Sequence, residues 1–143
     1  MPVLALPTDR PRPPVQTYRG AVQHFTLDAT LTAALKQVGR GVGATPYMTL
    51  LAAYATLLPR YSGQDDLIIG SPFACRDRAG LEGLVGYLAN PVALRADLHD
   101  DPTFTELLGR VKDTVLGALA HQDYPFPLLV ERLRPARDAG RTP

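Results

Sequence analysis

The sequence predicts an α/β fold, in the form of a layered α+β sandwich with helices packed against a sheet. Segments of alternating or β-branched apolar residues, typical of strands, interleave with longer segments whose apolar residues recur at helical spacing. Of the 143 residues, 45% are hydrophobic and 20% are charged, which is the profile of a globular protein that can bury a core. This length suits one domain, and the sequence contains no internal repeat.

Residues 1–17 are dense in proline, and residues 18–143 form the predicted domain. Proline fixes its own φ and disfavours helix in the residue before it, so we expect an extended linker. The alternative is a polyproline segment that binds an aromatic-lined groove, although a linker is the simpler interpretation. After it, Ala21–Leu27 alternates loosely and is predicted to form the first strand.

Two helices are predicted next, each from a capping residue followed by apolar residues at helical spacing. Asp28 can cap the first, whose end is weakened by several glycines. Thr45 and Pro46 provide a hydroxyl N-cap and a proline at the first helical position of the second. The apolar stripe of this second helix comprises Tyr47, Leu50, Leu51, Tyr54, Leu57 and Leu58.

Two strands and two further helices are predicted in the rest of the chain. Asp66–Ala74 begins with a short β-branched run and Pro91–Leu98 alternates, so both indicate strands, separated by a polar loop. Asp101-Pro102 is predicted to start a long helix, helped by Thr103 and Glu106, which have the spacing of a capping box. Pro125 then opens a short last helix.

Composition argues against several classes of function. The formal net charge is +1 and no basic run is interleaved with aromatics, so nucleic acid is not an expected partner. The longest apolar stretch, residues 47–58, is shorter than the ~18 residues that a membrane span needs. No apolar signal core follows Met1, so we expect a cytoplasmic protein without a membrane partner. A single cysteine, Cys75, excludes an internal disulfide.

The usual catalytic constellations do not assemble from this sequence. No metal pattern of the form His-x-x-x-His or Cys/His is present, so no metal site is predicted. The histidines are His24, His99 and His121. Ser71 lacks the second glycine of a nucleophile elbow, which argues against a serine triad. Arg76 or Arg78 could lower the pKa of the Cys75 thiol, but no partner base is evident and a passive cysteine is preferred.

Two segments are less easily explained as a simple loop or helix end. In Leu84–Arg95, Asn90 stands beside a proline where a strand begins. It can be a turn residue, or it can project its amide into a cleft. His121–Pro127 places a histidine, an amide and a carboxylate at a helix end, followed by Tyr-Pro-Phe. From the residues alone, a rigid corner between two helices is the preferred interpretation of this second segment.

These segments resemble signature sequences of nonribosomal peptide synthetase condensation domains. VGYLANPVALR (Val85–Arg95) resembles the fifth signature, a Gly-x-Phe-Val-Asn core ending in Arg. HQDYPFP (His121–Pro127) matches the sixth, His/Asn-Gln-Asp-Tyr-Pro-Phe, and RDAGRTP (Arg137–Pro143) resembles the seventh more loosely. Thr49–Arg78 is similar to the family's central region, and Leu6–Pro14 resembles the lead-in between its two lobes.

The resemblance implies a chloramphenicol acetyltransferase-like C-terminal lobe whose final strands are missing. The family's catalytic motif, His-His-x-x-x-Asp-Gly, belongs to the N-terminal lobe and does not occur in this sequence. The resemblance therefore implies that this fragment has no catalytic residue and is inactive alone. The chain departs from the fifth signature at Leu88-Ala89, where Phe-Val is usual, and at Pro91, where Thr is usual.

For the intact domain the resemblance implies amide-bond formation by acyl transfer, in the biosynthesis of natural products such as antibiotics. A donor acyl group and an acceptor aminoacyl group, tethered as thioesters to the 4′-phosphopantetheine of two peptidyl carrier proteins, meet in a tunnel between the lobes. No cofactor is bound directly. The implied partners are the N-terminal lobe, the donor and acceptor carrier proteins and an adjacent adenylation domain.

Within this chain the resemblance implies that Asn90 faces the tunnel, where its amide could bond the reacting groups, with Tyr87 in the same wall. The other signature residues, with a structural role, are Gly86, Arg95, His121, Gln122, Asp123, Pro125 and Phe126. One alternative is a non-catalytic scaffold or docking module derived from such a domain, with apolar surface that favours self-association. Another is an epimerisation or heterocyclisation domain, against which the asparagine of VGYLAN and the HQDYPF string argue.

Overall fold

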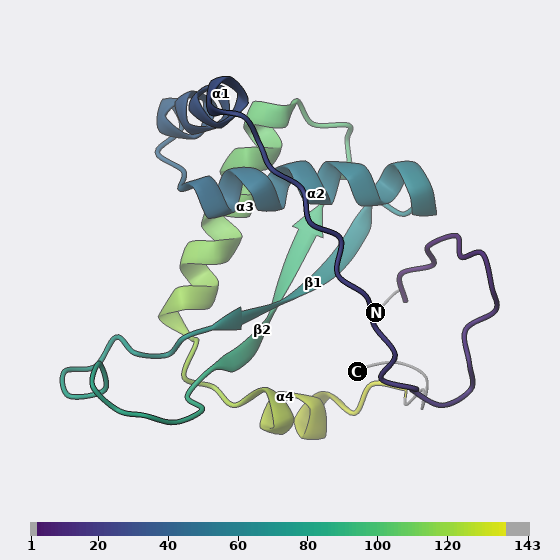
Figure 1. The fold of residues 1–143 in the computed structure, drawn as a ribbon, viewed down its shortest axis with the longest axis vertical. Coiled ribbons are helices and arrows are strands. Elements are labelled where there is room, and N and C mark those ends of the chain that lie inside the picture. Colours follow the sequence, from purple (N-terminus) through teal and green to yellow (C-terminus); the bar gives the residue numbers. More distant parts are fainter. Residues whose placement is uncertain (1–2, 137–143) are drawn as a thin grey trace.

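The computed structural model describes residues 3–136, which form helices on a short antiparallel sheet (Figure 1). In chain order the elements are α1 (Ala29–Gly41), α2 (Pro46–Ser62), β1 (Asp66–Phe73), β2 (Asn90–Asp97), α3 (Phe104–Ala120) and α4 (Phe126–Leu133). Helices and strands occur together, so the predicted α/β class is confirmed. Within the described part, no helix is both long and apolar enough to cross a bilayer. Arg137–Pro143, with the loosest signature resemblance, lies outside the described residues.

The helices begin where the sequence provides a cap. At the start of α1, the Asp28 carboxylate accepts a hydrogen bond from the Leu31 N–H at 2.7 Å. At the start of α3, the Glu106 carboxylate accepts from the Thr103 N–H at 2.8 Å, while Thr103 Oγ1 accepts from the Glu106 N–H at 3.4 Å. Thr45 caps α2 in a similar way. Such caps satisfy backbone N–H groups that the first helical turn leaves free. The predicted starts of α1 and α2 are confirmed, whereas α3 begins at Phe104, after its Thr103 cap, and not at Asp101-Pro102.

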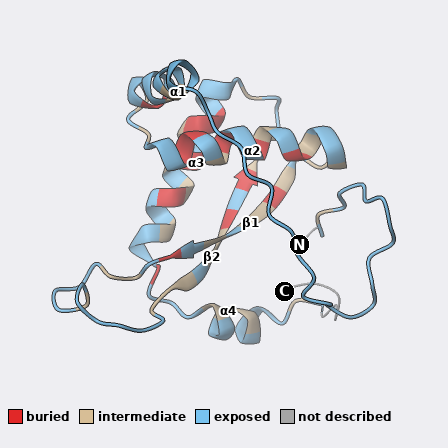
Figure 2. Cartoon of the chain, in the orientation of Figure 1, coloured by how far each residue is buried: buried red, intermediate tan, exposed pale blue. Residues whose placement is uncertain are grey.

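The core lies between α2, α3 and the two strands. β1 and β2 pair antiparallel, with Asp66 opposite Asp97 at one end and Phe73 opposite Asn90 at the other. Figure 2 shows the buried residues on α2, α3 and the strands. The largest side chains that are fully buried belong to Thr49, Leu94, Leu107 and Leu108. Each large apolar side chain removed from water contributes about 1.5–3 kcal/mol, so this layer holds the helices to the sheet.

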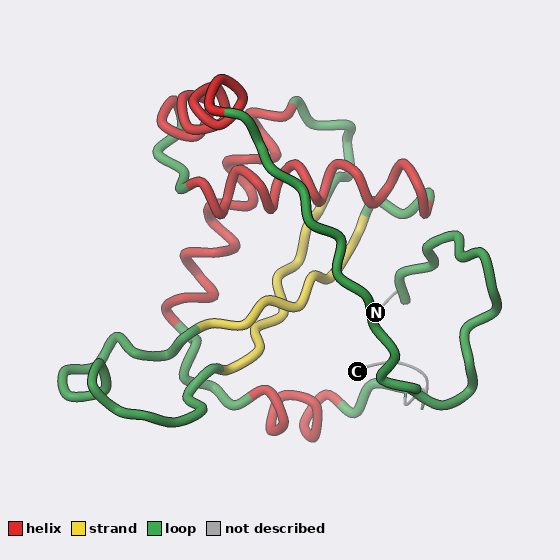
Figure 3. The backbone as a smooth tube through the Cα atoms, viewed as in Figure 1, coloured by secondary structure: helices red, strands yellow, loops and turns green. Residues whose placement is uncertain are grey.

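The predicted strand Ala21–Leu27 is wrong. These residues form a loop (Figure 3), and Phe25 within them is 81% exposed. A strand is stabilised by a neighbour that completes its ladder of hydrogen bonds, and the sheet of the described residues contains only β1 and β2. Alternation of apolar residues is therefore not sufficient to form a strand here.

The first described residues are attached to the end of α2. The Gln64 side chain accepts a hydrogen bond from the Ala5 N–H at 2.8 Å and donates to the Val3 carbonyl at 3.1 Å. Residues 3–17 contain no helix or strand. The linker role of residues 1–17 stays a prediction.

Candidate functional site

The two signature segments meet at the side chain of Asn90, the first residue of β2. Its amide nitrogen donates to the carbonyl oxygens of Gln122 at 2.9 Å and of Tyr124 at 2.8 Å. Its amide oxygen accepts from the Phe126 N–H at 3.0 Å. Both amide hydrogens are therefore committed to the backbone of the turn between α3 and α4.

This turn needs an outside acceptor because α4 has no cap of its own. Pro125 is the N-cap residue of α4 and makes no side-chain hydrogen bond there. The Phe126 N–H is one of the donors that the first helical turn leaves free, and Asn90 supplies the acceptor that a capping side chain would normally provide. The prediction that Pro125 opens a short helix is confirmed, with the cap coming from β2.

A third segment, Cys75–Arg78, contacts the same turn. Asp77 accepts a hydrogen bond from the Gln122 side-chain amide at 3.1 Å, and Arg78 forms an ion pair with Asp123. The Cys75 backbone has a left-handed φ of 49° just after β1 ends. We call Cys75–Arg78, Asn90 and His121–Phe126 together the junction.

Gln122 is the buried centre of the junction, with an exposed fraction of 9%. Its carbonyl oxygen accepts from Asn90 and from the Cys75 thiol at 3.6 Å, and its side chain donates to Asp77. A buried polar group costs free energy unless it is hydrogen-bonded, so these contacts are what allow a glutamine here. The only sequence signal for the third segment is its run of alternating charges, Arg-Asp-Arg. This signal is weak, because it does not reveal that the segment contacts Gln122 and Asp123 of the turn.

The other predicted tunnel residue, Tyr87, lies outside this hydrogen-bonded centre. With Gly86 it belongs to the loop between β1 and β2, which extends away from the core (Figure 1), and Tyr87 is 85% exposed. His121 is the exposed C-cap residue of α3. The tunnel roles of Asn90 and Tyr87 stay predictions, and for Asn90 the structure adds that its amide hydrogens are used within the chain.

Arg95, the last residue of the fifth signature, lies on the opposite face of β2 from Asn90, because side chains alternate along a strand. Its guanidinium donates to both carboxylate oxygens of Asp66, at 2.7 and 3.0 Å. This hydrogen bond lowers the pKa of Asp66. Nearby, a hydrogen bond of 2.7 Å between His99 and Asp97 raises the pKa of the histidine and lowers the pKa of the carboxyl. These groups lie at the end of the sheet remote from the junction.

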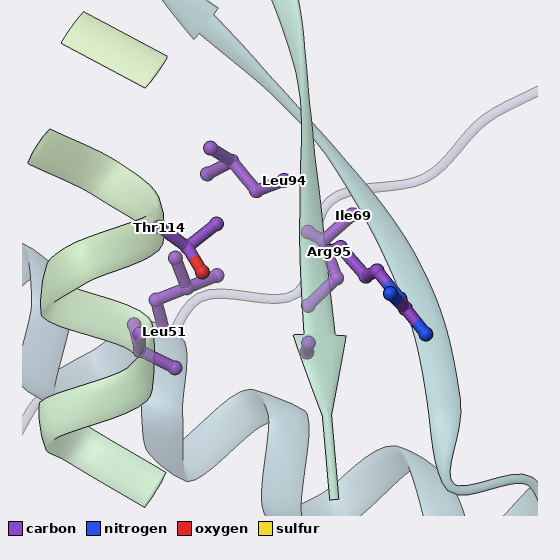
Figure 4. A pocket seen from close by; sticks show the side chains of 7 residues that line it. Leu51, Ile69, Leu94, Arg95 and Thr114 are labelled. Carbon is purple, nitrogen blue, oxygen red and sulfur yellow. The ribbon is translucent and has the colours of Figure 1, made fainter. Parts of the chain in front are cut away.

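A shallow hollow between α3 and the sheet is less suited to chemistry (Figure 4). Its lining consists of Leu51, Ile69, Leu94, Arg95, Ala96, Val111 and Thr114. Figure 4 shows the Arg95 guanidinium directed away from α3, so the hollow lacks the converging polar groups of a small-molecule site. Within residues 3–136, no cluster of His, Cys, Asp and Glu could hold a metal ion. The junction is therefore the candidate site.

The whole chain, residues 1–143, matches the family model described as Condensation domain. The chain belongs to the condensation domain family. One subunit of the linear gramicidin synthase from Brevibacillus parabrevis is 53% identical over 142 residues, which cover 99% of this chain and 2% of that protein. Surfactin synthase subunit 1 from Bacillus subtilis (strain 168) is 46% identical over 143 residues, which cover 100% of this chain and 4% of that protein.

Solved structures agree with this assignment. A four-domain nonribosomal peptide synthetase, crystallised in its holo form with AMP and glycine, matches with a TM-score of 0.95 and 28% identity over 99% of this chain and 11% of that chain. The X-domain from teicoplanin biosynthesis matches with a TM-score of 0.90 and 37% identity over 98% of this chain and 31% of that chain. The predicted chloramphenicol acetyltransferase-like fold and the resemblance to condensation domains are confirmed. The condensation domain chain spans only a small part of these relatives, 2% and 4% of the two synthases above.

Proposed function

We propose that these residues belong to the C-terminal lobe of a condensation domain and form one wall of the tunnel in which an amide bond is made. In this proposal two peptidyl carrier proteins deliver a donor acyl group and an acceptor aminoacyl group as thioesters of 4′-phosphopantetheine. The acceptor amine attacks the donor carbonyl, the C–N bond forms, and the C–S bond breaks to release the donor carrier's thiol. The N-terminal lobe and an adjacent adenylation domain complete the set of partners.

The junction is the observation that carries this proposal beyond the family match. The fifth and sixth signature segments are in direct contact there, through the bonds from Asn90 to the backbone of Gln122, Tyr124 and Phe126. A tunnel wall must hold two tethered groups at a reacting distance, and such positioning depends on a rigid backbone. The hydrogen bonds between the first residue of β2 and the turn between α3 and α4 provide such a rigid backbone.

Proton transfer is assigned to residues outside this chain. The His-His-x-x-x-Asp-Gly motif does not occur in the 143 residues, and a general base must lie within hydrogen-bond reach of the attacking amine. We therefore expect these residues alone to be inactive and to supply position rather than acid–base chemistry.

Asn90 fixes the wall in this proposal rather than binding the developing oxyanion. Both of its N–H donors already go to backbone carbonyls, of Gln122 and Tyr124, and an oxyanion would have to displace one of them. Loss of Asn90 then slows the reaction through movement of the α3–α4 turn. A misplacement of about 1 Å can cost on the order of 100-fold in rate.

The test is a single-turnover condensation assay on the intact condensation domain that contains these residues, with loaded donor and acceptor carrier proteins. Amide product on the acceptor carrier supports the proposal. A variant altered in the His-His-x-x-x-Asp-Gly motif is the control and should form none. A wild-type domain that binds both carriers but forms no amide contradicts the proposal and favours the docking-module alternative.

One observation favours that alternative. Leu50, Tyr54, Leu57 and Tyr61 recur at helical spacing along α2, and their side chains are about half exposed. Exposed apolar side chains that lie together promote association. Sedimentation of the intact domain discriminates between the two, since a monomer indicates that these side chains are covered within the domain, whereas reversible self-association indicates a docking surface.

A further inference from the structure

The loop between β1 and β2 is organised by one side chain, Arg76. Residues 74–89 contain no helix or strand. The Arg76 guanidinium donates to three carbonyl oxygens of this loop, those of Leu81 and Leu84 at 2.8 Å each and that of Gly86 at 3.2 Å. One planar cation therefore sets the path of the loop from residue 81 to residue 86.

Apolar packing contributes little to the order of this loop. The side chains of Leu84, Val85 and Tyr87 are exposed, Val85 completely. Backbone hydrogen bonds form two turns, from the Leu81 N–H to the Arg78 carbonyl at 3.1 Å and from the Leu84 N–H to the Leu81 carbonyl at 3.3 Å. Hydrogen bonds from a charged donor are stronger than neutral ones, and the rigid fork of a guanidinium can serve several acceptors at once. Loss of Arg76 should therefore release the loop tip and leave the core intact.

Both ends of the loop are attached to the junction. At its start, Asp77 and Arg78 contact the turn between α3 and α4, and at its end Asn90 bonds the same turn. Between these fixed ends, the last acceptor of Arg76 is the carbonyl of Gly86, which belongs to the peptide bond that leads into Tyr87. Arg76 thus fixes the backbone from which the exposed Tyr87 ring projects.

We propose that Arg76 is a positioning residue for acyl transfer and that it acts through Tyr87. By holding three carbonyls of the loop, it places the Tyr87 ring where it contacts the tethered acyl substrate. An aromatic side chain offers an acyl group a large apolar surface at low entropic cost, provided that its backbone is fixed. This inference rests on the function proposed above.

A double-mutant cycle on the intact domain tests the coupling, with the single-turnover rate of amide formation as the readout. Arg76→Ala and Tyr87→Ala are each expected to lower the rate about tenfold, through misplacement or loss of the ring. The double variant should lie within about twofold of either single variant, since residues that act as a unit are not additive. Arg76→Lys should behave as Arg76→Ala, because an ammonium group is a point donor that cannot span three carbonyls.

Arg110→Ala is the matched control. Arg110 also donates to backbone carbonyls, of Asp97 at 3.3 Å and of His99 at 3.1 Å, but at the opposite end of the sheet. It should keep the wild-type rate and the wild-type pattern of limited proteolysis. Arg76→Ala and Arg76→Lys should instead be cleaved faster between residues 78 and 89, with little change in melting temperature. If Arg76→Ala does not fold, the double-mutant cycle is measured with Arg76→Lys in its place.

Two outcomes overturn the inference. One is an unchanged rate in the folded Arg76 variants. The other is a double variant in which the two losses multiply to about 100-fold, as independent sites would give. Failure of the proposed function would be recognised separately, because the wild-type domain would then form no amide at all.

Discussion

Replacing Asn90 with alanine should loosen the turn between α3 and α4. The substitution deletes the bonds to the carbonyls of Gln122 and Tyr124 and the bond from the Phe126 N–H. Each such bond contributes about 0.5–1.5 kcal/mol net, and an unpaired group costs most where water cannot replace the partner. Gln122 is almost fully buried, whereas Tyr124 is exposed and its carbonyl can be hydrated. We therefore expect a loss of about 2–3 kcal/mol in the local stability of the turn.

Hydrogen–deuterium exchange of the Phe126 amide in the intact domain measures this loss directly. A loss of about 2–3 kcal/mol corresponds to roughly 30- to 160-fold faster exchange through local opening. Gln64→Ala is the matched control, because Gln64 also bridges two backbone groups with a side-chain amide, those of Ala5 and Val3. That variant should leave Phe126 exchange unchanged. Unchanged protection of Phe126 in Asn90→Ala would refute the reasoning, since the amide would then not depend on Asn90.

Asn90→Asp separates the two halves of this effect. Aspartate keeps an acceptor for the Phe126 N–H but removes both donors and places a carboxylate against the carbonyl oxygens of Gln122 and Tyr124. Two acceptors facing each other without a proton are repulsive, so this variant should exchange at least as fast at Phe126 as Asn90→Ala. Slower exchange than in Asn90→Ala would show that the single bond to Phe126 outweighs the two donated bonds.

Two further predictions concern stability away from the junction. Gly39→Ala should lower the free energy of unfolding by about 1–3 kcal/mol in urea titrations, because its Cβ would lie 2.7 Å from Thr49 Oγ1 in the core. Gly41→Ala, on the same helix with open space around it, should be neutral or slightly stabilising. The raised pKa of His99 stabilises the fold below the ordinary histidine value of 6.5, and this contribution is lost as pH rises through the folded value. The lowered pKa of Asp97 stabilises above its ordinary value of 3.8 and is lost as pH falls. His99→Gln should therefore lower Tm most between these two ordinary values, and its effect should shrink as pH rises through the raised pKa of His99. A loss of Tm that does not change with pH over this range would contradict the assignment.

The helix starts could be predicted from the sequence because their causes are local. A cap such as Asp28 or the Thr103–Glu106 box acts over three residues, and the structure forms each of these bonds. Ala21–Leu27 alternates loosely, which predicts a strand, and it is not a strand. A strand depends on a partner elsewhere in the chain, and the alternation of side chains carries no information about whether that partner is present.

The candidate site was predictable only in part, for the same reason. The signature segments could be identified, but the bonds that join them connect residues 32 to 36 positions apart. In the sequence, Cys75–Arg78 suggests at most a reactive thiol, and its residue types do not predict its contacts with Gln122 and Asp123. Arg76 illustrates the limit most clearly, because its partners are backbone carbonyls, which every residue possesses and which no residue type reveals.

The geometry of β2 explains why the asparagine and the arginine of one signature have separate tasks. Leu94 and Ala96 are buried on the same face of the strand as Asn90, whereas Arg95 points to the other face and binds Asp66 of β1. The strand is thus attached to the α3–α4 turn by its first residue, to the core by its middle, and to β1 by the arginine. The loop between β1 and β2 is therefore fixed at both of its ends. The position of its tip depends on Arg76, which binds three carbonyl oxygens of the loop. The hydrogen bonds of the two signature residues therefore lie on opposite faces of one strand and at different ends of it.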